Sequence, residues 1–194
     1  MKAVLMSIQP KWCELIASGK INDDVRKTVE VRKTRPNIKT PFKVYIYCTK
    51  GRSEALWRYM GEYYYDTQFP NERPNKANGK VIGEFVCDEI YSDNQFNDKT
   101  RELLDNACLT LFDIAKYLKP MQVAHFWHIS NLIIYDKPKK LSEFYIPCYS
   151  GCDNCEYQSW DYSYAGGKDL ICTVRNKKPI KRPPQSWCYV EELG

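Results

Sequence analysis

Hydrophobic and polar positions alternate most strictly in residues 27–32, which read KTVEVR. Successive side chains of a β-strand point to opposite faces, so this pattern places Thr28, Glu30 and Arg32 on one face and the two valines on the other. A cation, a carboxylate and a hydroxyl therefore share one surface. Such a surface is typical either of a solvated sheet face or of a functional site.

The residues before this strand predict a strand that runs into a short helix. Residues 5–8 (LMSI) end the strand, Pro10 suits the first helical turn, and Gly19 ends the helix. Apolar side chains at helical spacing predict its buried stripe, which comprises Trp12, Leu15 and Ile16.

The same patterns predict the later elements. Strands are expected at 43–48, 80–90 and 124–135, with a turn at 78–79. Gly83 indicates a bulge or a tight bend, and Thr110 is expected to cap the second of two helices within 98–118. Residues 51–78 show no sustained period beyond a possible helical turn at 55–60. Together these elements predict an α+β fold, a small, mixed and mostly antiparallel β-barrel with short flanking helices.

Composition narrows the class of protein. A chain of 194 residues that is 43% hydrophobic and 27% charged is typical of one globular core. A net charge of +5 favours a polyanionic partner only weakly, but fifteen tyrosines and five tryptophans exceed the needs of one core. Aromatic rings interleaved with lysine and arginine are typical of single-stranded nucleic acid binding, although tyrosines also favour sheet surfaces. No apolar run approaches the ~20 residues of a membrane helix, and the start lacks a signal-peptide pattern, so a cytoplasmic protein is expected.

The chain resembles the ASCH domain of the PUA-like superfamily, and within it the longer proteins of phages and prophages. The resemblance rests on the order of the motifs SIQP at 7–10, GK at 19–20, KTVEVR at 27–32, WHIS at 127–130 and PPQSWCYV at 183–190. Six residues separate GK from KT here, so either Lys20 or Lys27 holds the lysine position of the family. The register with Glu30 and Arg32 favours Lys27. The resemblance implies a small β-barrel with helices beside a cleft.

Candidate site residues come from three predicted elements. They are Lys27, Thr28, Glu30 and Arg32 on one strand, His128 and Ser130 on another, and Trp12 at the helix start. In a small barrel these residues would meet around one basic and aromatic cleft. Phe126 and Leu132 share the face of His128 and favour a hydrogen-bonded core histidine as the alternative. Trp127 and Trp187 are expected in the core because their neighbours are apolar.

The resemblance implies binding of RNA, DNA or a modified nucleoside, because PUA-like domains recur in such recognition. Lys27 and Arg32 would contact a phosphate or a carbonyl edge, and Glu30 would accept from an exocyclic amine. The chain has no nucleophile elbow, phosphate loop or paired metal-binding carboxylates.

The family also implies an alternative, a small hydrolase. Certain small ASCH proteins are amidohydrolases that act on N4-acetylcytidine, and others have been described as ribonucleases. Lys27 matches their catalytic lysine, but Glu30 stands where they carry a threonine, and the downstream glutamate is one of Glu84, Glu89 and Glu102. With Lys27 and Glu30 as the catalytic pair, Glu30 would activate water and Lys27 would stabilise the oxyanion. A third alternative is a phage-encoded protein-interaction factor.

Four cysteines lie in a segment with few core-forming residues. Cys148, Cys152 and Cys155 have the spacing of metal ligands, and Cys172 follows a glycine pair, although Cys188 competes with it as the fourth ligand. A closed tetrahedral zinc site would supply the order that this segment lacks. We therefore predict a barrel domain of residues 1–147 plus 179–194 and a Cys-rich insertion, 148–178, that binds structural zinc.

Overall fold

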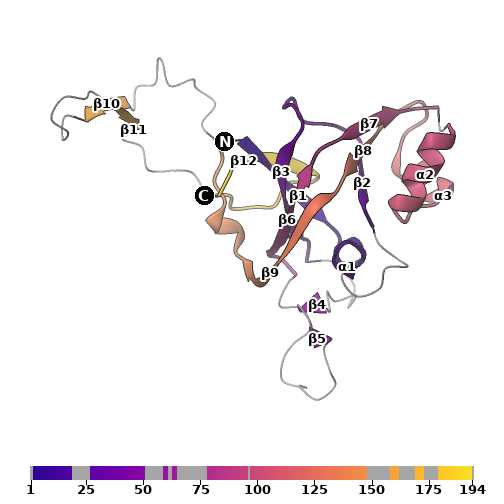
Figure 1. Ribbon diagram of the computed structural model, residues 1–194, viewed down its shortest axis with the longest axis horizontal. Coiled ribbons are helices and arrows are strands. Elements are labelled where there is room, and N and C mark those ends of the chain that lie inside the picture. Colours follow the sequence, from indigo (N-terminus) through magenta and orange to yellow (C-terminus); the bar gives the residue numbers. More distant parts are fainter. Residues whose placement is uncertain are drawn as a thin grey trace.

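The computed structural model describes residues 2–18, 27–50, 59–60, 63–64, 78–95, 97–147, 158–161, 169–172 and 179–193. The described helices are α1 (Pro10–Ser18), α2 (Asp98–Asn106) and α3 (Leu111–Tyr117), with a 3₁₀ turn at Leu141–Glu143. The described strands are β1 (Lys2–Ile8), β2 (Val29–Arg32), β3 (Phe42–Cys48), β4 (Tyr59–Met60), β5 (Tyr63–Tyr64), β6 (Val81–Cys87), β7 (Ile90–Asp93), β8 (Ala124–His128), β9 (Ser130–Lys139), β10 (Gln158–Asp161), β11 (Asp169–Cys172) and β12 (Trp187–Glu191). Figure 1 shows their arrangement. Among the helices that the structure describes, none is long and apolar enough to cross a membrane.

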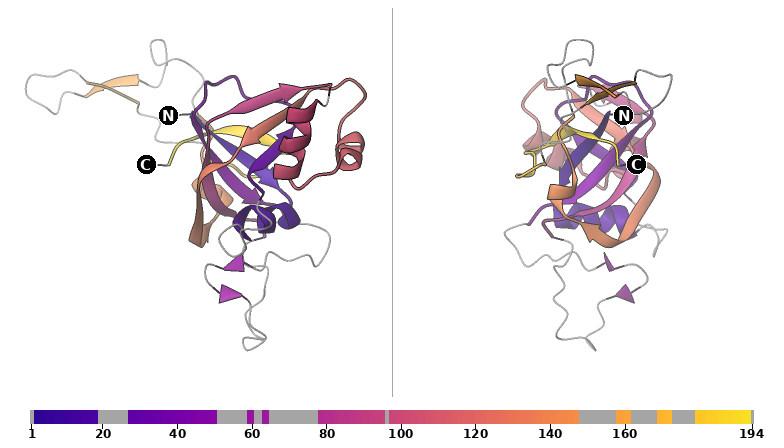
Figure 2. Two further views of the ribbon diagram at one scale, coloured as in Figure 1. Left: turned by 45° about the vertical axis from the view of Figure 1, so that its right-hand side comes forward. Right: turned by 90° about the vertical axis from the view of Figure 1, so that its left-hand side faces the viewer.

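A five-stranded sheet in the order β12-β1-β3-β6-β9 forms the centre of the molecule (Figures 1 and 2). Only β1 and β3 pair in parallel; the other neighbours are antiparallel. Val44, Ile46 and Cys48 face the core that α1 covers, as predicted. Tyr45 and Tyr47 are also buried, in a second core on the opposite face that includes Phe144 and Val190. Both faces of this sheet are therefore covered.

A three-stranded sheet in the order β2-β8-β7 packs against α2 and α3. Val29, Val31 and Phe126 contact the apolar stripe of the two helices, which contains Leu104 and Ile114. Thr110 caps α3 as predicted: its hydroxyl accepts from the Asp113 N–H, while the Asp113 carboxylate accepts from the Thr110 N–H. The valine face of the KTVEVR strand is thus a core face, because two helices cover it.

The predicted strand at 124–135 divides at Ile129 into β8 and β9 and passes from one sheet to the other. The Ile129 N–H donates to the Thr28 carbonyl at 2.8 Å, while Ser130 already pairs with Val86 of β6. The described strands form separate sheets with no closed barrel among them, so the small β-barrel stays a prediction. The coarser expectation, an α+β fold with mostly antiparallel strands, is confirmed.

Gly83 lies where β6 departs from regular pairing, as predicted. The register between β3 and β6 shifts past Ile82, and the register between β6 and β9 shifts next to Gly83. A Cβ atom at Gly83 would collide with the carbonyl oxygen of Ile133. Glycine is required because the β9 backbone approaches so closely. The predicted turn at 78–79 is also present.

The residues that flank the Cys-rich segment on its two sides are neighbours in space. Tyr145 forms an isolated bridge with Pro179, and the Ile180 N–H donates to the Phe144 carbonyl at 2.8 Å. Within the segment, β10 and β11 pair as an antiparallel hairpin. The division into a barrel domain and an insertion stays a prediction. Of the helical turn predicted at 55–60, residues 55–58 lie outside the described residues, and Tyr59–Met60 is the strand β4.

Candidate functional site

Backbone hydrogen bonds hold the start of the KTVEVR strand between two helix ends. The Lys27 N–H donates to the Leu15 carbonyl of α1 at 3.2 Å, and the Thr28 N–H donates to the Asn106 carbonyl of α2 at 2.9 Å. The Lys27 ammonium then donates to the Ala107 carbonyl at 2.8 Å. These bonds fix Lys27 at the junction of α1, α2 and β2. Lys20 lies outside the described residues.

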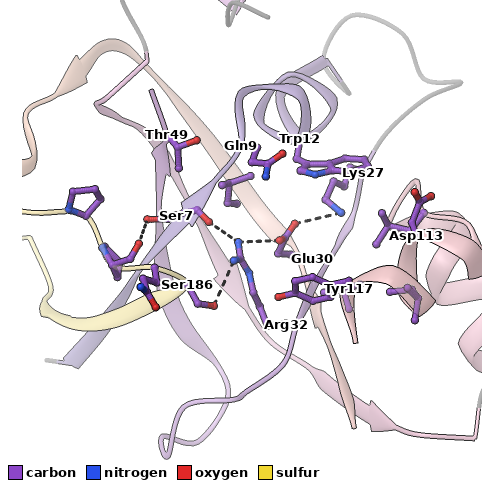
Figure 3. Close-up of a pocket in the computed structure, with 17 residues that line it drawn as sticks. Ser7, Gln9, Trp12, Lys27, Glu30, Arg32, Thr49, Asp113, Tyr117 and Ser186 are labelled. Atoms are coloured by element: carbon purple, nitrogen blue, oxygen red, sulfur yellow. Dashed lines mark hydrogen bonds and ion pairs between the residues drawn. The ribbon is translucent and has the colours of Figure 1, made fainter. Parts of the chain in front are cut away.

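Three charged side chains form a buried cluster beside this junction, and we call Lys27, Glu30 and Arg32 the floor triad (Figure 3). Glu30 Oε2 lies 3.3 Å from Lys27 Nζ, and Glu30 Oε1 lies 2.9 Å from Arg32 Nη2. Lys27 is 2% exposed, and Glu30 and Arg32 are each 7% exposed. A carboxylate between two cations offsets part of the desolvation cost of all three charges.

Arg32 connects the triad to both ends of the chain. Its Nη2 donates to the Ser7 carbonyl of β1 at 2.8 Å, and its Nη1 donates to the Ser186 hydroxyl at 3.5 Å. Ser7 in turn donates through its hydroxyl to the Pro184 carbonyl at 2.7 Å. The segment before β12 is thereby fastened beside the triad.

The triad retains unused hydrogen-bonding atoms. Glu30 Oε2, although ion-paired with Lys27, and Arg32 Nε are buried and have no hydrogen-bond partner within the described part of the chain. Leaving a buried polar atom without a hydrogen bond costs about 1–3 kcal/mol. Both atoms are covered by the chain beside the pocket, so side chains must move before a ligand can reach them.

The triad lines a pocket of about 600 Å³, within the range of roughly 300–1,000 Å³ typical of small-molecule sites. Figure 3 shows Trp12 and Tyr117 on opposite sides of Glu30. The remaining lining residues come from the turn before α1, from the end of β3, from α3 and from the segment before β12; they include Gln9, Thr49, Asp113, Ile114, Pro183, Pro184, Gln185 and Ser186. The pocket thus has a charged floor and walls that are aromatic and apolar.

Two titratable groups of α3 lie at the pocket. Burial raises the pKa of Tyr117 above its ordinary value, so its phenol is protonated at neutral pH and can donate a hydrogen bond. Hydrogen bonds from the hydroxyl and N–H of Thr110 hold the pKa of Asp113 below its ordinary value. Asp113 is exposed and ionised, and it is the second carboxylate of the pocket lining.

Exposed lysines lie over both aromatic walls. Lys11 Nζ is 4.5 Å from the ring centroid of Trp12, and Lys33 Nζ is 4.6 Å from that of Tyr117. Lys27 approaches Trp12 as well, at 5.2 Å. These are cation–π distances.

The structure brings together four of the seven predicted site residues. Trp12, Lys27, Glu30 and Arg32 line the pocket. Thr28 does not line it and takes part through its backbone, as described above.

His128 and Ser130 also lie away from the pocket lining. His128 is exposed at the end of β8, where its Nδ1 lies 2.7 Å from Asp88 Oδ1, so the alternative of a core histidine is wrong. Ser130 donates to the Val86 carbonyl at 2.8 Å. The predicted convergence of the two strands fails for these residues because the chain changes sheets between them.

The three glutamates considered for a hydrolase lie outside the pocket lining. Glu84 pairs with Lys43 at 3.0 Å, Glu89 is exposed beside Lys99, and Glu102 is exposed on α2. The sequence analysis missed Asp113 and Tyr117 because the polar side of a short helix is ordinarily solvent-facing. The capping pair of Thr110 and Asp113 was the available signal for the position of this helix.

The structure does not test the predicted zinc site. Cys148, Cys152, Cys155 and the side chain of Cys172 lie outside the described residues, and the described residues contain no group of three potential ligands. Burial raises the pKa of the competing Cys188 to about 11, which disfavours the thiolate that a metal requires. Zinc binding by the other four cysteines stays a prediction.

The fold and the pocket define a small α+β domain with a charged cavity between its two sheets and its helices. No protein family model matches the chain, and no curated protein matches it. Among solved structures, the chain is similar to ASCH from Zymomonas mobilis, with a TM-score of 0.50 and 17% identity over 98% of this chain and 88% of that one. A serine-to-alanine mutant of the same protein also gives a TM-score of 0.50 and 17% identity, over 98% and 89%. The chain therefore has the fold of these ASCH structures, which confirms the resemblance at the level of the fold; the phage type stays a prediction.

Proposed function

We propose that the pocket binds one base of RNA or single-stranded DNA, or a modified nucleoside. The observation that carries this proposal is a pocket of about 600 Å³ in which the Glu30 carboxylate lies beside Arg32 and between the rings of Trp12 and Tyr117. The edge of a nucleobase presents donors and acceptors side by side, so it matches an acceptor next to a donor. The similarity of the fold to ASCH structures is consistent with this class of ligand.

The floor triad has two cations and one carboxylate, so it is the position of the Glu30 carboxylate, and not the net charge, that disfavours an anion at this point of the floor. The Glu30 carboxylate lies between the two cations and would repel a phosphate that approached its Oε2 atom. A neutral base that donates from an exocyclic amine to Glu30 gains a charge-assisted hydrogen bond. Trp12 and Tyr117 supply aromatic surface at the sides. The pocket therefore suits a flat, polar and uncharged group.

The test compares two glutamates that are both paired with lysine. Titration calorimetry with cytidine, N4-acetylcytidine, adenosine and guanosine, and anisotropy with a labelled RNA hexamer, would be measured for wild type, Glu30→Gln and Glu84→Gln. We expect Glu30→Gln to weaken binding about five- to 150-fold, because a base contact is worth about 1–3 kcal/mol, and Glu84→Gln to leave it unchanged. Equal affinities in all three proteins would refute the proposal.

A second variant covers the case in which Glu30→Gln does not fold. Tyr117 is 37% exposed, so Tyr117→Ala removes one wall with little loss of core. It should weaken binding as well, because a stacked base is worth about 1–3 kcal/mol. Normal binding by folded Tyr117→Ala and lost binding by Glu84→Gln would place the ligand elsewhere.

The same incubations test the hydrolase alternative. The distance of 3.3 Å between Lys27 Nζ and Glu30 Oε2 is compatible with a carboxylate base beside an oxyanion-stabilising cation. Release of cytidine from N4-acetylcytidine, or scission of the hexamer, that disappears in Lys27→Ala would replace the binding proposal with catalysis.

A further inference from the structure

The two cations of the floor triad are held inside the protein and do not extend toward the sugar-phosphate backbone of a ligand. Lys27 Nζ is held by the Ala107 carbonyl and Glu30, and Arg32 Nη2 is held by the Ser7 carbonyl and Glu30. Both side chains are almost entirely buried. A phosphate outside the pocket would therefore need other partners.

Lys11 and Lys33 have the position and the exposure that such partners need. Both are exposed, and each lies over a ring that lines the pocket, Trp12 for Lys11 and Tyr117 for Lys33. The two rings stand on opposite sides of Glu30 in Figure 3, so each lysine lies against a different wall of the pocket. A cation–π contact at an exposed site is worth about 0.5–1 kcal/mol, so an ammonium can exchange it for a phosphate contact.

On the basis of the proposed function, we infer that the pocket takes an internal nucleotide of a single strand, whose flanking phosphates bind Lys11 and Lys33. The base enters toward Glu30, and the chain continues past the pocket on both sides. The exposed carboxylate of Asp113 lies at the same pocket and repels phosphate from the start of α3. The site would thus prefer an oligonucleotide to a free nucleoside.

The experiment measures the salt dependence of hexamer binding for wild type, Lys11→Gln, Lys33→Gln and the double variant. Lys99→Gln is the matched control, because Lys99 also lies over a tyrosine ring, 4.4 Å from that of Tyr91, but this ring does not line the pocket. Each pocket variant should reduce the slope of log K against log salt by about 0.7, and the double variant by about 1.4, because each phosphate contact releases condensed counterions. Lys99→Gln should keep the wild-type slope.

Free nucleoside separates this inference from the proposed function. If the nucleoside binds in a Glu30-dependent manner, but the hexamer binds no tighter and the lysine variants keep the wild-type slope, the phosphate path is wrong and the base pocket stands. If neither ligand depends on Glu30 or Tyr117, the base pocket itself is wrong. A hexamer that binds more tightly than the nucleoside, with slopes reduced only by Lys11→Gln and Lys33→Gln, supports both.

Discussion

The molecule has two clusters of charged residues, one on the five-stranded sheet and the other, the floor triad, at strand β2 of the three-stranded sheet. They differ in how many of their polar atoms have a hydrogen-bond partner. In the sheet-face cluster, Lys43 pairs with Glu84 at 3.0 Å and with Glu192 at 3.5 Å, and the Tyr135 hydroxyl donates to the second oxygen of Glu84. Each carboxylate oxygen of Glu84 therefore has a partner. In the floor triad, Glu30 Oε2 and Arg32 Nε have no hydrogen bond within the described residues.

Exposure sharpens this difference. The side chains of Lys43 and Glu84 are 26% and 17% exposed, whereas those of Lys27 and Glu30 are 2% and 9% exposed. The better hydrated cluster is complete, and the more deeply buried one is not. Buried polar atoms are ordinarily satisfied, so unsatisfied ones beside a cavity indicate where a ligand completes the structure.

The largest expected effect separates the two clusters by stability. Glu30→Leu leaves Lys27 and Arg32 buried without their carboxylate, which should lower the free energy of unfolding by about 3–5 kcal/mol. Glu84→Leu leaves Lys43 with Glu192 and with solvent, and should cost about 1 kcal/mol or less. Urea denaturation followed by circular dichroism measures both values. Losses of the same size would mean that burial does not distinguish the clusters.

A smaller effect concerns high pH and the sheet-face cluster. Burial raises the pKa of Tyr135, and the hydrogen bond with Glu84 raises it further. Burial alone would lower the pKa of Lys43, but its hydrogen bond with Glu84 and the charges of Tyr45, Glu84 and Glu192 together outweigh this and raise it. Both groups hold their protons more tightly when folded, so their contribution to stability is complete below about pH 10 and is lost as the pH rises further.

The urea midpoint should therefore fall between pH 9 and pH 11, and Tyr135→Phe should reduce this fall. Wild type and Tyr135→Phe are compared at each pH with the same urea series. The titration of the other groups then affects both midpoints equally and cancels in their difference. A fall of the same size in Tyr135→Phe would show that Tyr135 does not hold its proton in the folded chain.

The smallest effect on the pocket is expected from changes in the Cys-rich segment. If this segment binds zinc, it is a third region, ordered separately from the two charged clusters. Protein purified from zinc-supplemented medium should contain about one equivalent of zinc, as a closed four-ligand site requires. Cys152→Ser should lose the metal, while Cys188→Ser, whose residue packs against the second core, should retain it. Nucleoside binding should be unchanged in both. Wild-type protein that contains no zinc after this purification would refute the prediction.

Local patterns were sufficient for most of the elements. Alternation predicted that Glu30 and Arg32 share a face, helical spacing predicted α1, and Thr110 predicted the start of α3. Alternation identified only one buried face of β3, because Tyr45 and Tyr47 are aromatic residues that also suit an exposed sheet surface.

The rest of the site depends on contacts between distant segments. Asp113 and Tyr117 lie more than eighty residues after Lys27, and no local pattern indicates that α3 covers this strand. His128 was placed in the site because a small barrel would bring its strand to the same cleft. In the structure this strand pairs with β2, and His128 lies opposite Val29. Residues opposite one another share a face, so His128 lies on the face of the valines and not on that of Glu30.

The bonds of Arg32 have a consequence for the order in which the site can be completed during translation. Its partners are Ser7 and Glu30, made early, and Ser186, made almost last, while β12 pairs with β1 in the register of Lys2 with Glu191. A nascent chain that has emerged only as far as residue 180 has neither the Pro183–Ser186 side of the pocket nor the outer strand beside β1. The pocket is therefore completed only after Ser186 has been made, and a product that stops before Pro183 would lack one side of it even with every residue of the floor triad present.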